Sequence, residues 1–248
     1  MTIRLKCLIA QPLASTRLLC IPFAGGGTTV FRAWSALLPK HIEAFAVQLP
    51  AREDRMREPA FEQWRPMMEA LVEAVAALPA LPTAIFGHSL GAVIGLELAR
   101  WMHVSQPGRL RHLFAGGRPW PGRGTAERAD LHALPDAEFL QVLDRQYGSL
   151  SSSLSHPEVR ELTLPTLRAD LRLLDSYRYA SSPSLDCPLT VYGGTDDPTT
   201  TAESLDAWRQ ETRGPFRVRM LNGHHFFLDP HRTQLIKEIA STLETSGG

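Results

Sequence analysis

A turn with glycine at both ends, Gly87-His88-Ser89-Leu90-Gly91, joins an apolar strand to a helix that starts at once. The run before it, 83–86, is rich in strand formers, and the run after it, 92–98, has the apolar composition of a buried helix. Glycine has no side chain, so the backbone can turn sharply while strand and helix approach closely. We therefore predict that Ser89 is held in a strained conformation, with its side chain projecting from a sheet.

Short apolar runs alternate with longer helical patterns along the chain, which is typical of βαβ units and a mainly parallel sheet. The expected fold class is therefore α/β, with helices flanking the sheet. Helical apolar spacing covers 34–38, 61–78 and 90–102, and a last helix is expected over about 233–243. The expected strands are 17–22, 44–49, 83–86, 110–115, 189–192 and 216–221, with 5–9 as an edge strand.

The 248 residues fit a single domain, 1–248, with one large insertion. About seventy residues separate the strands at 110–115 and 189–192, too many for a simple connection. We expect a helical lid over about 117–182, which covers the site; the alternative is an insertion that only packs on the sheet edge. Within it, one helix opens at Pro135 and Asp136 and ends at Gln146, 149–155 is a loop, and Pro165 opens another helix with Leu167, Leu171 and Leu174 on one face.

Charge and cysteine content argue against several classes of protein. Lys+Arg and Asp+Glu both number 26, so no overall field favours nucleic acid or an anionic membrane. We find no signal peptide, and no apolar run approaches the roughly 18 residues of a membrane-spanning helix. Cys7, Cys20 and Cys187 are far apart, which disfavours a disulfide framework or a zinc site. We expect a cytoplasmic protein with no metal and no cofactor.

Ser89 is the candidate nucleophile, because Gly-x-Ser-x-Gly between a strand and a helix is the nucleophile elbow of the α/β-hydrolase fold. The helix N-terminus favours negative charge, and the Leu90 N–H can donate to the oxygen of a tetrahedral intermediate. A second donor is expected in the loop 22–27, with the Ala24 N–H as the candidate. The three glycines of that loop lack the spacing of a phosphate-binding loop. The alternative role of Ser89 is that of a helix cap only.

A serine nucleophile needs a base, and in this fold the order along the chain is serine, acid, histidine. Among nine histidines, His224 and His225 directly follow a late core strand and mark the base region. The acid should follow the preceding strand, where Asp196 and Asp197 both stand. One of the two would orient the imidazole, and the other could cap the helix that includes 205–208. Spacing alone does not distinguish them.

Two other roles for histidines are disfavoured. His224, His225, Asp229 and His231 resemble a set of metal ligands, but adjacent histidines point in different directions and no His-Glu-x-x-His face is present. His88 precedes the nucleophile directly, and we expect it to pack beside the site rather than to act as the base.

Four segments together resemble the stand-alone type II thioesterases of polyketide synthases and non-ribosomal peptide synthetases. They are Pro22-Phe23-Ala24-Gly25-Gly26, the run 48–55 (Gln-Leu-Pro-Ala-Arg-Glu-Asp-Arg), the elbow with its flanks at 86–92, and His225-Phe226-Phe227-Leu228. The resemblance spans nearly the whole chain, and the four segments together are far more specific than any one of them.

The resemblance implies a serine hydrolase with Ser89, Asp197 and His225 as its triad. The family has Gly-x-x-Asp-Pro, which Asp197 matches, and Gly-Gly-His-Phe-Phe, which puts His225 in the catalytic position. Two positions depart from the family: His224 and Ala51 each replace a glycine. The resemblance also implies hydrolysis of acyl groups from the phosphopantetheine arm of carrier proteins, which clears stalled chains, and a flexible lid over the acyl chamber.

Other functions stay open from the sequence. A small-molecule carboxylesterase or a chain-releasing, cyclising thioesterase would share every triad residue, and a non-catalytic acyl-carrier binding protein would share the cavity. The expected partner is an acyl or peptidyl carrier protein, whose acidic surface could meet Arg118, Arg123 and Arg128. The alternative for these arginines is a solvated charged loop.

Overall fold

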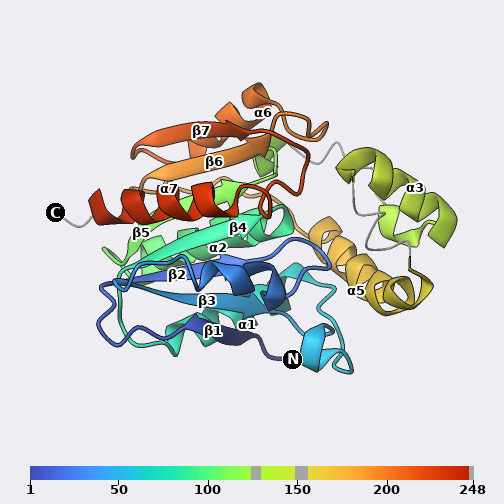
Figure 1. Cartoon of the computed structure of the whole chain (residues 1–248), viewed down its shortest axis with the longest axis horizontal. Coiled ribbons are helices and arrows are strands. Elements are labelled where there is room, and N and C mark those ends of the chain that lie inside the picture. Colours follow the sequence, from blue (N-terminus) through green and yellow to red (C-terminus); the bar gives the residue numbers. More distant parts are fainter. Residues whose placement is uncertain (124–129, 149–155, 246–248) are drawn as a thin grey trace.

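A seven-stranded sheet runs through the molecule in the order β1-β3-β2-β4-β5-β6-β7 (Figure 1). It is parallel except for β1, which pairs with β3 in the antiparallel sense. The computed structural model describes residues 1–123, 130–148 and 156–245. All seven expected strands are confirmed: β1 (Arg4–Ile9), β2 (Thr16–Ile21), β3 (Ile42–Gln48), β4 (Thr83–His88), β5 (Leu110–Gly116), β6 (Leu189–Gly194) and β7 (Phe216–Leu221).

Helices cover both faces of the sheet, as expected for this α/β class. On one face lie α1 (Trp64–Ala76) and α2 (Leu90–Ser105), and on the other α7 (Arg232–Thr245) and the 3-10 helix η1 (Thr28–Trp34). The short α6 (Ala202–Asp206) follows β6 and leads into the 3-10 helix η5 (Ala207–Glu211). Helix over 34–38 was expected and is wrong, since the helical turn there ends at Trp34. No described helix is long and apolar enough to cross a membrane.

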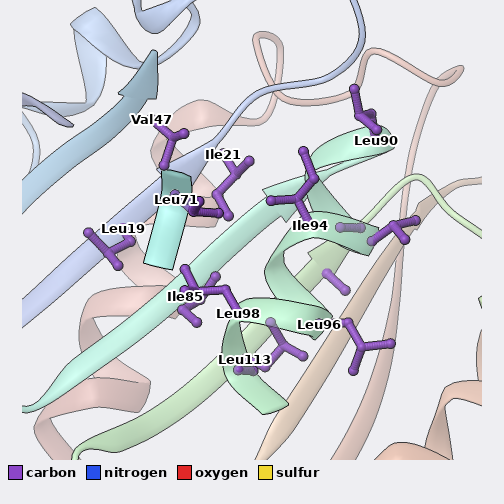
Figure 2. Close-up of a cluster of buried hydrophobic side chains, with 14 of the residues drawn as sticks. Leu19, Ile21, Val47, Leu71, Ile85, Leu90, Ile94, Leu96, Leu98 and Leu113 are labelled. Carbon is purple, nitrogen blue, oxygen red and sulfur yellow. The ribbon is translucent and has the colours of Figure 1, made fainter. Parts of the chain in front are cut away.

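Alternation along β2 divides the core between the two faces. Leu19 and Ile21 pack with α1 and α2, whereas Leu18 and Cys20 pack with α7 and η1. Figure 2 shows the first of these clusters, in which Leu19, Ile21, Ile85 and Leu113 of the strands meet Ile94 and Leu98 of α2. Because α2 is apolar on nearly all sides, it lies fixed against the sheet and holds the start of the helix at Ser89 in place.

The segment between β5 and β6 forms helices of its own, α3 (Asp136–Tyr147) and α5 (Pro157–Asp175), which lie together beyond one end of the sheet (Figure 1). The expected helix to Gln146 is confirmed as α3, and the expected loop over 149–155 falls outside the described residues. A helix opening at Pro165 is wrong, because α5 begins eight residues earlier and Pro165 lies inside it. The helix continues through the missing N–H donor because its next turns bury the expected apolar face, Leu167, Leu171 and Leu174.

Candidate active site

Ser89 stands at the junction of β4 and α2 in a conformation that L residues rarely adopt, with φ 56° and ψ −113°. Its N–H donates to the Gly116 carbonyl of the neighbouring strand at 2.7 Å, which fixes the turn to β5. The Ser89 side chain makes no capping hydrogen bond to α2, so the alternative role of a helix cap is wrong. The strained elbow expected from the sequence is therefore present, with its hydroxyl free for another partner.

The glycines of the elbow are required by close backbone contacts. A Cβ at Gly87 would lie 2.0 Å from the Gly91 carbonyl oxygen, and a Cβ at Gly91 would lie 2.2 Å from the Ile21 carbonyl oxygen. Both contacts join backbone to backbone, so no side chain can move aside to make room. These two positions explain why β4, α2 and β2 approach closely enough to hold Ser89 at the strand end.

His225 and Asp197 form a buried pair on the loops that follow β7 and β6. His225 Nδ1 and Asp197 Oδ2 are 2.8 Å apart, and the two residues are 2% and 4% exposed. Burial by itself would raise the pKa of Asp197, but hydrogen bonds from His225 and Thr199 and the nearby imidazole hold it below its ordinary value. Asp197 is thus a carboxylate that accepts a hydrogen bond from the Nδ1–H of His225, which leaves Nε2 of His225 as the basic nitrogen.

The structure separates the two acid candidates and the two histidine candidates. Asp196 is exposed and makes no contact with His225, and its backbone carbonyl pairs with Nδ1 of the exposed His224 at 3.0 Å. His224, in place of the family's glycine, therefore adds a polar link between the two loops. Asp196 does not cap the next helix, because the Thr201 hydroxyl accepts from the Ser204 N–H and fills that position.

Two backbone N–H groups beside Ser89 have no hydrogen-bond acceptor in the described part of the chain. Among the described residues, neither the Ala24 N–H nor the Leu90 N–H donates to another group. Leu90 is the first residue of α2, and Ala24 lies in the glycine-containing loop after β2. Both residues line the same small cavity as Ser89 and His225. The cavity thus combines a hydroxyl, an imidazole and two free backbone donors.

His88 is fully buried behind the base, as expected for a packed residue. Its ring meets those of His225 at 5.1 Å, Phe227 at 5.0 Å and Phe23 at 5.9 Å, all edge to face. Burial, and next the proximity of His225, lower the pKa of His88 well below its usual range. A neutral His88 is a ring that fixes the position of the His225 imidazole by contact and adds no positive charge beside it.

The Ser89 cavity holds about 30 Å³ and opens beside a groove of about 740 Å³. Phe23, Ala24, Leu167 and Phe226 line both, and the rings of Phe23 and Phe226 meet edge to face at 5.0 Å between them. The remaining lining of the groove is largely apolar and includes Val30, Trp34, Val159, Phe227 and Leu228.

The helices between β5 and β6 supply residues that sequence reasoning did not assign to the site. Tyr147, the last residue of α3, lies 4.7 Å from the His225 ring, and Leu143 and Leu171 also line the Ser89 cavity. The only signal in the sequence is the apolar face of each helix, which does not say what that face covers.

Three arginines were expected to face a carrier protein, and for one of them the prediction is wrong. Arg118 is 5% exposed and lines the Ser89 cavity, so it does not lie on a carrier-facing surface. Arg123 is half exposed and faces Glu203 at 3.7 Å, and Arg128 falls outside the described residues. Arg118 follows the end of β5 by two residues, after Gly117 with φ 62°, and this turn places it at the Ser89 cavity.

Comparison with known proteins places the chain in a family. The thioesterase domain model matches residues 16–243. The gramicidin S biosynthesis protein GrsT of Aneurinibacillus migulanus is 39% identical, over 93% of this chain and 90% of the relative. The structure of BorB, a type II thioesterase from the borrelidin biosynthetic cluster, has a TM-score of 0.85 with 33% identity, and covers 98% of this chain and 97% of that one.

YbtT, a type II thioesterase from the yersiniabactin NRPS/PKS pathway, has a TM-score of 0.81 with 25% identity, over 98% and 99% of the two chains. These relatives share the α/β-hydrolase fold described above. The family match and the identities extend over nearly the whole chain, the elbow and the terminal histidine loop included. The chain belongs to the thioesterase family, and its relatives are the type II thioesterases of non-ribosomal peptide and polyketide pathways.

Proposed function

We propose that Ser89, Asp197 and His225 are the catalytic triad of this thioesterase and that its substrate is an acyl group on the phosphopantetheine arm of a carrier protein. The observation that carries the triad is the buried His225–Asp197 pair, 2.8 Å long, which opens into the same cavity as Ser89. Ala24 and Leu90 are the proposed oxyanion donors. The whole chain, 1–248, acts as one catalytic domain with a lid over about 117–182.

In the first half-reaction, His225 Nε2 takes the proton of the Ser89 hydroxyl as its oxygen attacks the thioester carbonyl carbon. The carbonyl oxygen becomes negative and accepts hydrogen bonds from the Ala24 and Leu90 N–H groups. When the carbon–sulfur bond breaks, the proton passes from His225 to the leaving sulfur, and Ser89 carries the acyl group as an ester. Asp197 keeps its negative charge beside the imidazolium throughout.

In the second half-reaction, water takes the place that the Ser89 hydroxyl had in the first. His225 takes a proton from water, the hydroxide attacks the acyl carbon, and the same two N–H groups hold the oxyanion. The proton then returns to Ser89 as the ester bond breaks, which releases the carboxylic acid and restores the free enzyme. Apart from the thioester substrate and water, the reaction as written uses side chains and backbone groups of this chain.

The acyl chain is proposed to lie in the groove beyond Phe23 and Phe226. The Ser89 cavity of about 30 Å³ has room for little more than the reacting carbonyl, whereas the groove of about 740 Å³ falls in the range of ligand sites, about 300–1,000 Å³. Its apolar lining suits a hydrocarbon chain of several carbons. The edge-to-face contact of the two rings would have to open for a chain to pass.

The carrier protein enters the proposal through the resemblance to type II thioesterases and through relatives such as YbtT, which belongs to an NRPS/PKS pathway. The chain has equal numbers of acidic and basic residues, so any attraction to an acidic carrier has to come from a local patch. Its three cysteines are free, in keeping with the proposed location in the cytoplasm.

Intact mass spectrometry of carrier proteins tests the substrate class. Carrier proteins loaded with acetyl, hexanoyl and longer acyl groups are incubated with the wild-type chain, with Ser89→Ala and with no enzyme. We expect wild type to return carriers to the free thiol form and Ser89→Ala to leave them loaded. Hydrolysis of simple carboxylic esters, with every acyl carrier left intact, would instead support a carboxylesterase. A cyclic product would support a chain-releasing thioesterase.

A further inference from the structure

Arg52 and Asp170 form a buried ion pair between the turn after β3 and the lid helix α5. Arg52 Nη2 and Asp170 Oδ1 are 2.7 Å apart, Nη1 and Oδ2 are 3.0 Å apart, and the side chains are 5% and 1% exposed. The pair is bidentate and almost completely desolvated. Because a buried ion pair often adds little to stability compared with apolar packing, its presence here calls for a role in geometry.

The same two side chains hold the loop that carries the proposed oxyanion donor Ala24. Asp170 Oδ2 accepts the Gly25 N–H at 2.7 Å, and Arg52 Nη1 donates to the Gly26 carbonyl at 2.8 Å. Gly25 has φ +76°, a conformation that glycine adopts without strain but leaves as readily, having no side chain of its own to restrict it. The backbone directly after Ala24 is therefore fixed at two successive residues by one ion pair.

The turn that carries Arg52 is itself strained and fastened on both sides. Ala51 and Glu53 have φ 64° and φ 53°, although neither is glycine. The Ala51 carbonyl accepts the Thr166 hydroxyl of α5 at 2.6 Å, and the Glu53 carboxylate accepts the Thr28 hydroxyl at 2.7 Å. Strain of this kind persists where surrounding contacts over-determine the backbone. The turn thus links α5 to the loop and helix that follow β2.

We infer that Arg52 and Asp170 are positioning residues, which hold the Ala24–Gly26 loop so that the Ala24 N–H points at the oxyanion. Helix α5 is then part of the support of the catalytic site as well as its cover. Neither side chain lines the Ser89 cavity, so they act through the loop. The inference rests on the proposed triad and oxyanion donors.

A purely structural role would tether α5 and leave the chemical step unchanged. The two roles differ in what they do to the transition state. Loss of a tether lowers stability or weakens substrate binding, whereas misplacement of an oxyanion donor lowers kcat and the affinity for compounds that mimic the oxyanion, with little effect on KM. Stability alone therefore cannot separate them, but the kinetic constants can.

The test compares Asp170→Asn with a matched control that removes an exposed ion pair of the same helix. Asp170→Asn keeps the shape but removes the negative charge, and its single amide oxygen cannot replace both carboxylate oxygens, so the bidentate pair with Arg52 is lost. The control, Glu62→Gln, breaks the exposed pair of Glu62 with Arg172 of α5, 2.7 Å long and 48% and 42% exposed. Each full-length variant is assayed for hydrolysis of an acyl thioester of N-acetylcysteamine, for inhibition by an alkyl trifluoromethyl ketone and for the rate of labelling by a fluorophosphonate.

For Asp170→Asn we expect kcat to fall about 10–100-fold, less than the roughly 10²–10³-fold typical of losing a donor outright. KM should stay within about twofold, because neither Arg52 nor Asp170 lines the acyl groove. The ketone inhibition constant should rise by the same factor as kcat falls, and labelling should slow in parallel. Arg52→Lys, which keeps the charge but loses the paired donors, should fall between Asp170→Asn and wild type. Glu62→Gln should match wild type.

Wild-type labelling rate and inhibition constant in folded Asp170→Asn would overturn the inference, as would a loss confined to KM. If Asp170→Asn fails to fold by circular dichroism, Arg52→Lys decides by the same readouts. If the fluorophosphonate labels Ser89 equally fast in wild type and in Asp170→Asn, only the positioning role is contradicted. Wild type that no fluorophosphonate labels contradicts the proposed catalytic site itself, and the positioning role with it.

Discussion

On the sheet side of the Ser89 cavity, backbone groups touch backbone groups, whereas on the lid side the cavity is closed by side chains. The elbow is held by contacts that leave no space for a Cβ at Gly87 or Gly91. The lid side is held by the Arg52–Asp170 pair and by an apolar cluster that joins α3 to α5. Backbone contacts permit one geometry, whereas side-chain contacts can be exchanged without changing the fold.

Helices α3 and α5 also differ in how they are held to the rest of the molecule. Helix α5 reaches the body of the molecule through Thr166, Asp170 and Arg172, which bond to partners before α1. Helix α3 packs on α5 through Phe139 and Leu143, and Tyr147 at its end lies against His225. We therefore expect α5 to stay fixed, and α3, which lines the Ser89 cavity through Leu143 and Tyr147, to be the helix that can move.

The largest effect is expected from the sheet side, at the acid. Asp197→Asn should lower kcat about 10³–10⁴-fold, because the amide can donate to Nδ1 and stabilise the wrong imidazole tautomer. Asp196→Asn, one residue away and exposed, should stay within about twofold of wild type. Steady-state kinetics on one thioester decides, and equal losses in both variants would refute the assignment of Asp197.

Next comes the backbone contact under the elbow. Gly91→Ala places a methyl group 2.2 Å from the Ile21 carbonyl oxygen and should cost more than about 3 kcal/mol of unfolding free energy, or prevent folding. Gly95→Ala on the same helix meets only side-chain atoms, the nearest of them Ile85 Cγ2 at 3.2 Å, and should cost less than about 1 kcal/mol. Urea unfolding measures both, and similar values for the two would mean that the elbow can shift.

A smaller effect concerns the buried histidines of the sheet. Burial lowers the pKa of His112 to about 3, and that of His88 is also lowered. Since the unfolded chain binds these protons near pH 6.5 and the folded chain does not, stability is highest above that pH and falls as the pH drops. Each histidine should lower the free energy of unfolding by about 1 kcal/mol between pH 6 and pH 5.

His112→Gln checks this sign, because Gln can still donate to the Thr190 hydroxyl that His112 Nε2 meets at 2.9 Å. The variant should lose about 1 kcal/mol less than wild type over the same pH interval in urea unfolding. A loss as steep as that of wild type would show that His112 is not held neutral in the folded chain.

The smallest effect is expected on the lid side, at Ala51. Its φ of 64° shows that alanine keeps the conformation for which the family uses glycine. Ala51→Gly removes strain of about 1–2 kcal/mol but adds unfolded-state entropy of about 0.4–1 kcal/mol, so a net gain of about 0.5 kcal/mol is expected. Thermal unfolding measures it, and a loss would mean that the turn is not strained.

The sequence predicted what depends on local pattern. Short apolar runs rich in strand formers predicted every strand, and the Gly87 to Gly91 turn predicted the strain at Ser89. The local pattern could not distinguish adjacent candidates. Asp196 and Asp197 differ only in which side chain the turn directs inward, and the family pattern was needed to favour Asp197. The Arg52–Asp170 pair joins residues 118 apart, and although Arg52 lies in one of the segments that mark the family, no local signal shows that it pairs with Asp170.

Rapid-quench mass spectrometry of the protein after mixing with an acyl carrier protein tests the central claim most directly. We predict an acyl adduct on the peptide that contains Ser89, which forms and decays in wild type and accumulates when the second half-reaction is slow. Ser89→Ala should show neither adduct nor hydrolysis. An adduct on any other residue, or full hydrolysis by Ser89→Ala, would contradict the assignment of Ser89 as the nucleophile.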